Sequence, residues 1–378
     1  MSTAVRSYSK INLGLAIGPP RPDGFHSLNT LYQTLALHDF VTVSASPAPK
    51  TTIRLTSNDP RVPLDARNTV WKILEKTLIT QALPAEVTVH ISKHLPIQGG
   101  MGAGSANAAA ALIGLEHELS LVLPPQLRLK LAADVGSDVP LFLVGGSVFG
   151  TDRGQIVAPA PPVTLAGKVQ IPCVIALPAR GVSTPQAFRD WDRRFTQASG
   201  QFGPDLHKPQ IRDTIGQLSR TYASVFLHRE SNKKYGASGI FPDPSHAQHD
   251  SPEKLHGFSR EQLHTPSETH GTSGFEDDLA GNSLLALVRT GIENDFETVV
   301  FLQYPLLRDI KRHLMGSPEA SNRAVYSALS GSGSALFGLY RCQADANAAQ
   351  QRLQHHGVQA IVTSTLPRPL YWSDMFAE

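Results

Sequence analysis

The stretch LPIQGGMGAGSANAAAAL, residues 95–112, holds four glycines within six residues and then an alanine-rich run. Glycine lets the backbone turn sharply and approach a ligand closely. Ser105 is a favourable N-cap residue, and residues 106–112 form helix readily. The stretch therefore predicts a glycine loop followed by the N-terminus of a helix. Free N–H groups and the positive end of the helix dipole make such a place an anion site, typically for phosphate. The alternative is a tight turn before an ordinary helix.

Two familiar phosphate-binding patterns do not fit this loop. A Walker loop needs Lys-Ser or Lys-Thr after its last glycine, whereas Gly104 is followed by Ser105 and Ala106. A dinucleotide fingerprint needs a third glycine where Ser105 stands. A phosphate loop here belongs to another type.

The composition sets limits on the class of protein. The chain has 378 residues, enough for two domains, and 41% hydrophobic residues, enough for a substantial core. A net charge of +2 argues against a nucleic-acid partner. Two cysteines, Cys173 and Cys342, exclude a zinc ribbon or a disulfide scaffold and indicate a reducing compartment. No apolar run approaches the roughly 20 residues that span a bilayer. We therefore expect a cytoplasmic protein with no membrane partner.

Helical and strand patterns follow each other without strict alternation, which predicts an α+β fold. Lys10 and Asn12 share one face of the first strand, because strand side chains alternate. The expected strands are 4–17, 38–45, 51–56, 86–92, 142–149, 171–177 and 358–364, and the expected helices are 68–80, 105–121, 126–133 and 345–355, with helical patterning also over 278–315.

The character of the chain changes over residues 197–274. Proline, serine, glycine and glutamine dominate, and apolar periodicity is lost. These features predict a long, mobile, surface-exposed insertion without catalytic groups. His246 and His249 fall in it, but their irregular spacing, with no cysteine nearby, argues against a metal site.

Three separated segments carry the chemistry. SKINLGL at 9–15 places Lys10 in a strand, the glycine loop offers a phosphate cradle, and VGSDVPLFL at 135–143 places Asp138 in a loop. A kinase needs backbone donors and a cation for the phosphoryl group, together with a carboxylate for the attacking hydroxyl. Taken singly, Lys10 is also compatible with a surface strand lysine and Asp138 with a turn cap.

The chain resembles the GHMP kinases, because it contains their motifs in their order. These motifs are SKINLGL, PDGFHSL, LPIQGGMGAGSANAA, GSDVPLF, NDFE and LSGSGSALFGLY. The resemblance covers about 1–195 and 278–365 and implies a two-domain α+β architecture with the active site in the cleft between the domains. The domains would be 1–160 and 161–378, the second interrupted by the insertion 197–274. The NDFE segment at 294–297 is more consistent with helix initiation and packing than with catalysis.

The resemblance implies a role for each matching residue. Asp138 would be the catalytic aspartate, and Lys10 would lie beside it and help to position the hydroxyl. The ATP-binding residues would be Pro96, Gly99, Gly100, Gly102, Ala103, Gly104 and Ser105. Mg²⁺ would accompany ATP, with Ser105 as a weak candidate ligand.

The PDGFH segment points to members of the family that act on a cytidine diphosphate of methylerythritol. Phe25 and His26 would hold the cytosine ring, Phe188 would cover it, and Asn12 would face the same pocket. ATP would phosphorylate the 2-hydroxyl of this small-molecule substrate directly. The resemblance is compatible with a monomer or a weak homodimer. His26 as an ordinary turn residue and Phe188 as a core residue are the simpler alternatives.

The sequence departs from the family pattern at two positions. Ala103 stands at a position usually occupied by glycine, which requires a negative φ there, and Ala106 replaces a frequent serine. Lys10 and Asp138 are unaffected, so we expect an active enzyme. The alternatives are another GHMP kinase, acting on mevalonate, homoserine or a sugar, and an inactive homologue that only binds ligand.

Overall fold

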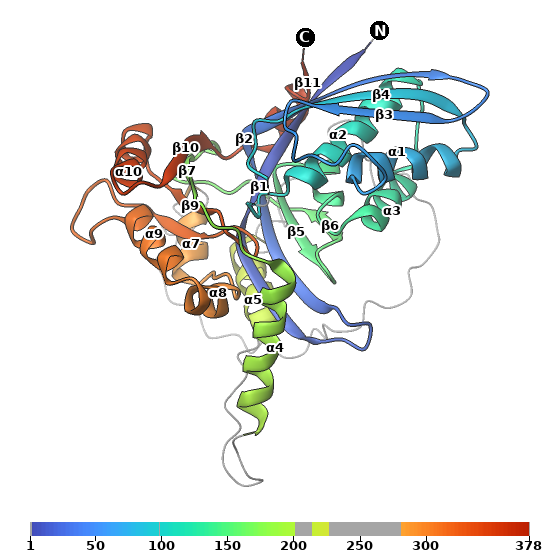
Figure 1. Ribbon diagram of the computed structural model, residues 1–378. Coiled ribbons are helices and arrows are strands. Elements are labelled where there is room, and N and C mark those ends of the chain that lie inside the picture. The colour runs from blue at the N-terminus through green and yellow to red at the C-terminus, as the bar shows by residue number, and fades with distance from the viewer. Residues whose placement is uncertain (1, 98, 201–213, 227–280, 378) are drawn as a thin grey trace, which may run out of the picture.

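The computed structural model describes residues 2–97, 99–200, 214–226 and 281–377, with the side chains of 195–200 left out. The described chain forms a seven-stranded and a four-stranded sheet, each accompanied by helices (Figure 1). The α+β class expected from the sequence is confirmed. His246 and His249 lie outside the described residues.

The first sheet is built around a long hairpin. β1 (Thr3–Pro20) pairs antiparallel with β2 (His26–Pro47), and the register shifts between Tyr8 and Lys10 and again between Asn12 and Gly14. β4 (Ala85–Ser92) continues the sheet antiparallel to β2, and β3 (Thr52–Ser57) runs parallel to β4. β5 (Ser147–Thr151) pairs with the other part of β2 and with β6 (Ile156–Pro159).

Helices α1 (Thr69–Thr80), α2 (Ala103–Glu118) and α3 (Pro125–Val135) pack with this sheet (Figure 1). The alanine-rich sequence of α2 lets it lie close to the strands, because its residues 106–115 are all buried. Gly114 shows how close the contact is, since an added Cβ would lie 2.6 Å from Val43. Burial of this small-residue helix fixes the position of its N-terminus.

Two local expectations are corrected in this region. Helix α2 begins at Ala103 and is capped by Gly102, so Ser105 is not its N-cap residue. The strand expected over 142–149 is a 3₁₀-helix, Pro140–Leu143, followed by β5. Pro140 suits the first turn of a helix. Gly145 and Gly146 have φ near 71°, so the extended conformation of β5 begins only after them.

The second sheet contains β7 (Pro172–Leu177), β8 (Tyr326–Leu329), β9 (Leu336–Leu339) and β10 (Gln359–Ser364) in the order β10-β7-β9-β8. The helical patterning of 278–315 corresponds to α7 (Ser283–Arg289), α8 (Glu297–Gln303) and α9 (Pro305–Met315). Helix α10 (Gln343–His355) precedes β10. These helices border the second sheet (Figure 1).

The chain passes between the two sheets more than once. The position expected for the domain boundary, between residues 160 and 161, lies between β6 and β7, where the chain leaves the first sheet. At the C-terminal end, α11 (Arg368–Ser373) and β11 (Phe376–Ala377) return to the first sheet, and β11 pairs with β1. The division into 1–160 and 161–378 stays a prediction.

The expected insertion contains an ordered helix. After α4 (Thr184–Gly200), the structure describes α5 (Thr214–Phe226), which contacts β1 and β2. Leu218 and Phe226 are buried in the core. The expectation of an exposed excursion is therefore wrong for residues 214–226. Residues 201–213 and 227–274 lie outside the described part of the chain.

Candidate active site

The glycine loop connects β4 to α2, and its shape depends on two glycines in the left-handed region. Gly100 and Gly102 both have a φ of 72°, a conformation that favours glycine. Ala103 is the first residue of α2 and is not among the residues with positive φ, which meets the condition set by the sequence. The free amides of the first turn of α2 therefore face the loop.

Lys10 lies directly against this loop from the middle of β1. Its backbone N–H donates to the carbonyl of Met101 at 3.1 Å, and an added Cβ on Gly102 would lie 3.2 Å from Lys10 Cγ. The side chain is 3% exposed, and its ammonium donates to Asn12 Oδ1 at 2.7 Å. The prediction that Lys10 and Asn12 share a face of the strand is confirmed.

The structure brings Asp138 to this lysine. Oδ2 of Asp138 lies 3.5 Å from Lys10 Nζ, and Oδ1 accepts a hydrogen bond from the Tyr32 hydroxyl at 3.0 Å. Burial, followed by the Asp138 charge and this hydrogen bond, raises the pKa of Tyr32 well above 10. Tyr32 therefore remains a proton donor to the carboxylate throughout the neutral range.

A second loop, residues 330–334 between β8 and β9, closes on the first. The Ser330 hydroxyl donates to the carbonyl of Gly100 at 3.0 Å, and the Gly331 amide donates to Asn12 Oδ1 at 2.9 Å. Asn294 holds this loop by donating to the carbonyls of Leu329 and Gly331, each at 2.8 Å. This small-residue loop and the NDFE segment thus join the second sheet to the glycine loop.

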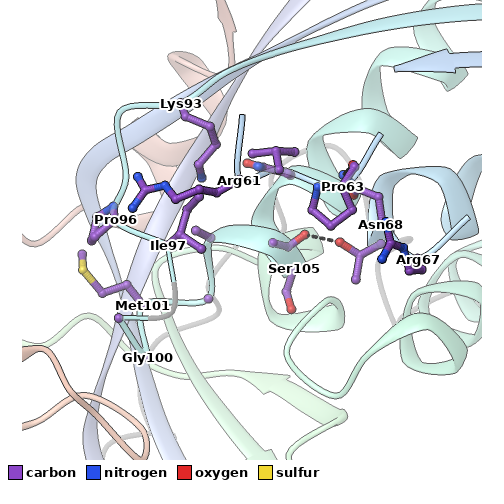
Figure 2. Close-up of a pocket in the computed structure, with 17 residues that line it drawn as sticks. Arg61, Pro63, Arg67, Asn68, Lys93, Pro96, Ile97, Gly100, Met101 and Ser105 are labelled. Atoms are coloured by element: carbon purple, nitrogen blue, oxygen red, sulfur yellow. Dashed lines mark hydrogen bonds between the residues drawn. The ribbon is translucent and has the colours of Figure 1, made fainter. Parts of the chain in front are cut away.

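A pocket of about 390 Å³ opens at the glycine loop (Figure 2). All seven predicted loop residues line it, namely Pro96, Gly99, Gly100, Gly102, Ala103, Gly104 and Ser105. Three cationic side chains that were not predicted, Arg61, Arg67 and Lys93, also line it. Arg61 and Arg67 pair with the aspartates two residues before them, and these arginines are 71% and 79% exposed. The walls thus combine backbone amides with cations, which suits an anionic ligand.

Aromatic side chains form a separate group at the far end of the β1–β2 hairpin. His26 stacks on Phe188 with ring centroids 4.9 Å apart, and Phe188 meets Phe296 edge to face at 5.0 Å. His26 Nε2 lies 2.7 Å from Asp192 Oδ1. Phe25 is 52% exposed and carries the Arg153 guanidinium 4.7 Å from its ring centroid. His26 and Phe188 are therefore together, while the Phe25 ring is half exposed beside Arg153.

The contributions of Tyr32, Ser330, Asn294 and Asp192 were missed by sequence reasoning. The LSGSGS loop and the NDFE segment stand out in the sequence, but their contact with the glycine loop depends on the tertiary structure. Tyr32 and Asp192 carry no sequence signal, since each is an ordinary residue of its element.

Two further properties concern only the described residues. They contain no group of three or more histidine, cysteine, aspartate or glutamate side chains placed to hold a metal ion. They also contain no helix long and apolar enough to cross a membrane.

The glycine loop before a buried helix, in a fold of two sheets, defines the class of GHMP kinases, and residues 68–146 match the GHMP kinases N terminal domain. The solved structures that share the fold include the following two. One is titled 4-(cytidine 5'-diphospho)-2C-methyl-D-erythritol kinase (TM-score 0.59, 21% identity, 96% of this chain and 98% of that chain). The other is homoserine kinase from Cytophaga hutchinsonii (TM-score 0.61, 17% identity, 97% and 95%).

The relatives found by sequence comparison share one protein name. The chain is 32% identical over 339 residues to 4-diphosphocytidyl-2-C-methyl-D-erythritol kinase of Solibacter usitatus, which covers 89% of this chain and 81% of the relative. It is 41% identical over 190 residues to the protein of the same name from Rhodococcus jostii, covering 50% of this chain and 59% of the relative. The chain therefore belongs to the 4-diphosphocytidyl-2-C-methyl-D-erythritol kinase family of GHMP kinases. It spans less than two thirds of the relatives from Rhodococcus jostii and Nocardioides.

Proposed function

We propose that this chain transfers the terminal phosphoryl group of ATP to the 2-hydroxyl of 4-diphosphocytidyl-2-C-methyl-D-erythritol, a step of the non-mevalonate route to isoprenoid precursors. The observation that carries the proposal is the Lys10–Asp138 pair, 3.5 Å apart and in contact with the glycine loop. The names of the relatives supply the substrate. Lys10 and Asp138 favour an active kinase over an inactive homologue.

ATP would bind with its phosphates on the glycine loop. The amides at the start of α2 and the helix dipole would hold the negative charge. Mg²⁺ prefers oxygen ligands and usually takes one or two from the protein and others from the phosphates. Ser105 lines the pocket. Its hydroxyl lies near the Asp138 loop, because a Cβ added to Gly136 would be 3.9 Å from Ser105 Oγ. Ser105 would supply one oxygen ligand at the wall of this pocket, and the ion would neutralise phosphate charge.

Asp138 would orient the substrate hydroxyl and accept its proton as the new P–O bond forms. The Tyr32 hydroxyl holds Oδ1 of Asp138, so Oδ2, which lies beside Lys10, would accept the proton. The ammonium of Lys10 would stabilise the negative charge that develops on the transferred group. Asn12, bound to both Lys10 and Gly331, keeps the ammonium in place. Transfer would be direct, without a phosphorylated enzyme.

The cytidine base would bind at the aromatic group. A centroid separation of 4.9 Å leaves no space for a base between His26 and Phe188. The base would therefore contact the edge of His26 and stack on an open aromatic face, for which the half-exposed Phe25 is available. Stacking of a base on an aromatic ring contributes about 1–3 kcal/mol.

We further propose a cytoplasmic location, a monomer or weak homodimer, and no nucleic-acid partner. The near-neutral net charge of +2 supports the last point.

An ADP-release assay with three acceptors tests the activity. The cytidyl substrate should be phosphorylated, whereas mevalonate and homoserine should not. Turnover with mevalonate or homoserine alone would assign the chain to another GHMP activity, and the absence of ADP release with every acceptor would reject the proposal.

A competition experiment tests the base site separately. CDP should inhibit the reaction with the cytidyl substrate, and UDP should inhibit it far less. Phe25→Ala, which removes the ring proposed to stack on the base, should raise KM for the cytidyl substrate more than it lowers kcat. Equal inhibition by CDP and UDP would show that these residues do not recognise cytosine.

A further inference from the structure

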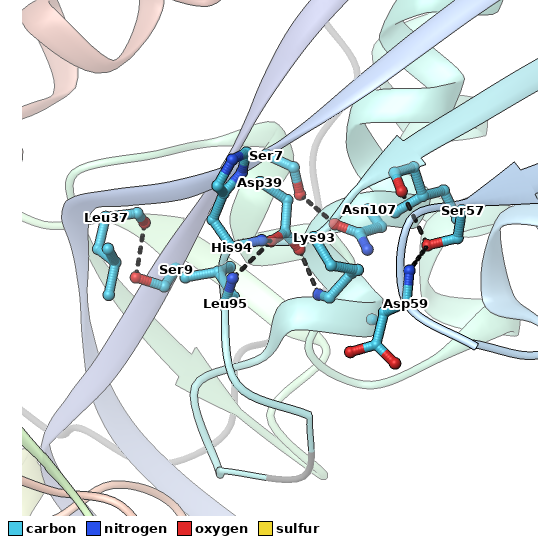
Figure 3. Close-up of polar contacts among 12 residues, drawn as sticks. Ser7, Ser9, Leu37, Asp39, Ser57, Asp59, Lys93, His94, Leu95 and Asn107 are labelled. Carbon is cyan, nitrogen blue, oxygen red and sulfur yellow. Dashed lines mark hydrogen bonds and ion pairs between the residues drawn. The ribbon is translucent and has the colours of Figure 1, made fainter. Parts of the chain in front are cut away.

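Asp39 is a completely buried carboxylate beside the nucleotide pocket, in the strand β2 (Figure 3). Its Oδ1 accepts hydrogen bonds from the backbone amides of His94 and Leu95, each at 2.7 Å. Its Oδ2 accepts from the ammonium of Lys93. When the side-chain amide of Asn107 is oriented so that its oxygen faces donors and its nitrogen faces acceptors, this nitrogen donates to Asp39 Oδ2 at 3.0 Å.

Burial of an ionised carboxylate is expensive unless the charge is paired and hydrogen-bonded. Asp39 meets this requirement with one cation and three neutral donors. Lys93 is itself 6% exposed, and its backbone is held by Asn58, whose Oδ1 accepts from the Lys93 amide at 2.7 Å. The position of the ammonium is therefore determined from both ends of the residue.

The donors to Asp39 belong to the two elements that shape the pocket. Residues 93–95 follow β4 directly and lead into Pro96, where the pocket-lining loop begins. Asn107 lies in α2, one turn after Ala103. Lys93 and Asn107 both line the pocket. A single carboxylate therefore ties the sheet to the start of the loop and to the helix behind it.

We propose that Asp39 is a positioning residue of the ATP site, which holds the Lys93 ammonium and the beginning of the glycine loop in the shape that binds nucleotide. The inference rests on the proposed function, because it takes the occupant of the pocket to be ATP. An ammonium has three donors, and the carboxylate occupies one of them, which leaves the others for a ligand in the pocket. Unlike Arg61 and Arg67, Lys93 is held in a buried position, so its placement is preorganised.

Asp39→Asn provides the first test, because it keeps the shape and an oxygen acceptor for the two amides but removes the charge. KM for ATP and Kd for ADP should rise by about tenfold or more, the expected effect of losing a charge-assisted hydrogen bond. KM for the cytidyl substrate should stay within about twofold, because that site lies elsewhere. ADP binding is measured by calorimetry, independently of any phosphoryl acceptor.

Two further variants separate positioning from general stability. Glu116→Gln breaks the half-buried Arg128–Glu116 pair in the same helix, away from the pocket, and should lower thermal stability with unchanged KM for ATP. Asp39→Asn combined with Lys93→Gln removes both charges, so it should fold stably while KM for ATP stays raised.

A wild-type Kd for ADP in Asp39→Asn overturns the inference, as does a wild-type KM for ATP in the double variant. An equal rise in KM for both substrates also overturns it, since the pair would then serve the fold alone. A wild-type protein that binds no ADP overturns the proposed function and this inference together.

Discussion

The hydroxyl of Tyr32 donates a hydrogen bond to Asp138 at 3.0 Å and leaves the other carboxylate oxygen facing Lys10. Asp138 is thus oriented by a neutral donor on one side and a cation on the other. The three side chains come from β2, from the loop before the 3₁₀-helix and from β1. Substitution of Tyr32, of Asp138 or of Lys10 should therefore affect the reaction in a different way.

Asp138→Asn keeps the shape of the side chain and removes the proton acceptor. We expect kcat to fall by roughly 10²–10⁴-fold with little change in either KM. The ADP-release assay measures both quantities. Asp134→Asn is a matched control, because Asp134 forms ion pairs with Lys76 and Lys130 and does not line the pocket. Near wild-type turnover of Asp138→Asn would refute the role of this residue.

The glycine loop allows a test based on backbone geometry alone. Gly100 has a φ of 72°, and an added Cβ would lie 2.2 Å from the carbonyl oxygen of Ser330. Gly104 lies within α2, and its added Cβ would meet nothing closer than 3.7 Å. Gly100→Ala should therefore abolish or strongly weaken nucleotide binding, since strain and clash both displace the loop.

Gly104→Ala should fold and gain stability by up to about 1 kcal/mol, because alanine favours the helix, whereas Gly100→Ala should lose stability. Chemical denaturation measures the two stabilities, and calorimetry with ADP measures nucleotide binding. Equal behaviour of the two alanine variants would contradict the described conformation of the loop.

The sequence was most informative where a short segment determines its own structure. The glycine loop and the strand containing Lys10 and Asn12 were predicted from composition and periodicity, and the α+β class is confirmed. The N-cap of α2 was misplaced by three residues, because the choice between Gly102 and Ser105 as cap depends on how the loop packs against Lys10. Tertiary contact here outweighs the intrinsic preference of serine.

Residues whose role depends on distant partners were not accessible from the sequence. Tyr32 has the appearance of any half-buried strand aromatic, and its function depends on Asp138, 106 positions later. Asp39 has no local sign of its contact with Lys93, 54 positions away. Helix α5 was missed because the surrounding polar, proline-rich residues mask its short apolar face.

Buried tyrosines predict a loss of stability in alkali. Burial raises the pKa of five tyrosine side chains above the ordinary value of 10, namely Tyr8, Tyr32, Tyr326, Tyr340 and Tyr371. Above pH 10 the unfolded chain loses these protons while the folded chain keeps them. The contribution of these tyrosines to the unfolding free energy should therefore be constant near neutral pH and fall as the pH rises through 10.

Tyr326→Phe removes one of these groups. Its unfolding free energy should decline less steeply than that of the wild type, by up to about 1.4 kcal/mol per pH unit. Urea unfolding at a series of pH values measures how steeply the unfolding free energy of each protein changes with pH. The difference between the two proteins at neutral pH gives the cost of losing the hydrogen bond from Tyr326 to the carbonyl of Leu13. Identical slopes would show that Tyr326 titrates equally in both states.

A substitution in helix α5 distinguishes a helix that packs on the core from an exposed excursion. Phe226 is 1% exposed, and Tyr222, one turn earlier, stacks on Phe149 of the first sheet. Phe226→Ala should lower the unfolding free energy by about 3–5 kcal/mol, since it removes a large buried ring and leaves a cavity. Ile79→Ala is the control, because Ile79 is 73% exposed at the end of α1 and its truncation should cost no more than about 0.5 kcal/mol. Both variants are compared by urea denaturation. If Phe226→Ala is as mild as Ile79→Ala, residues 214–226 do not stabilise the fold. If its cost is large, replacement of 197–274 by a short linker would remove part of the core, so a shortened protein has to keep this helix.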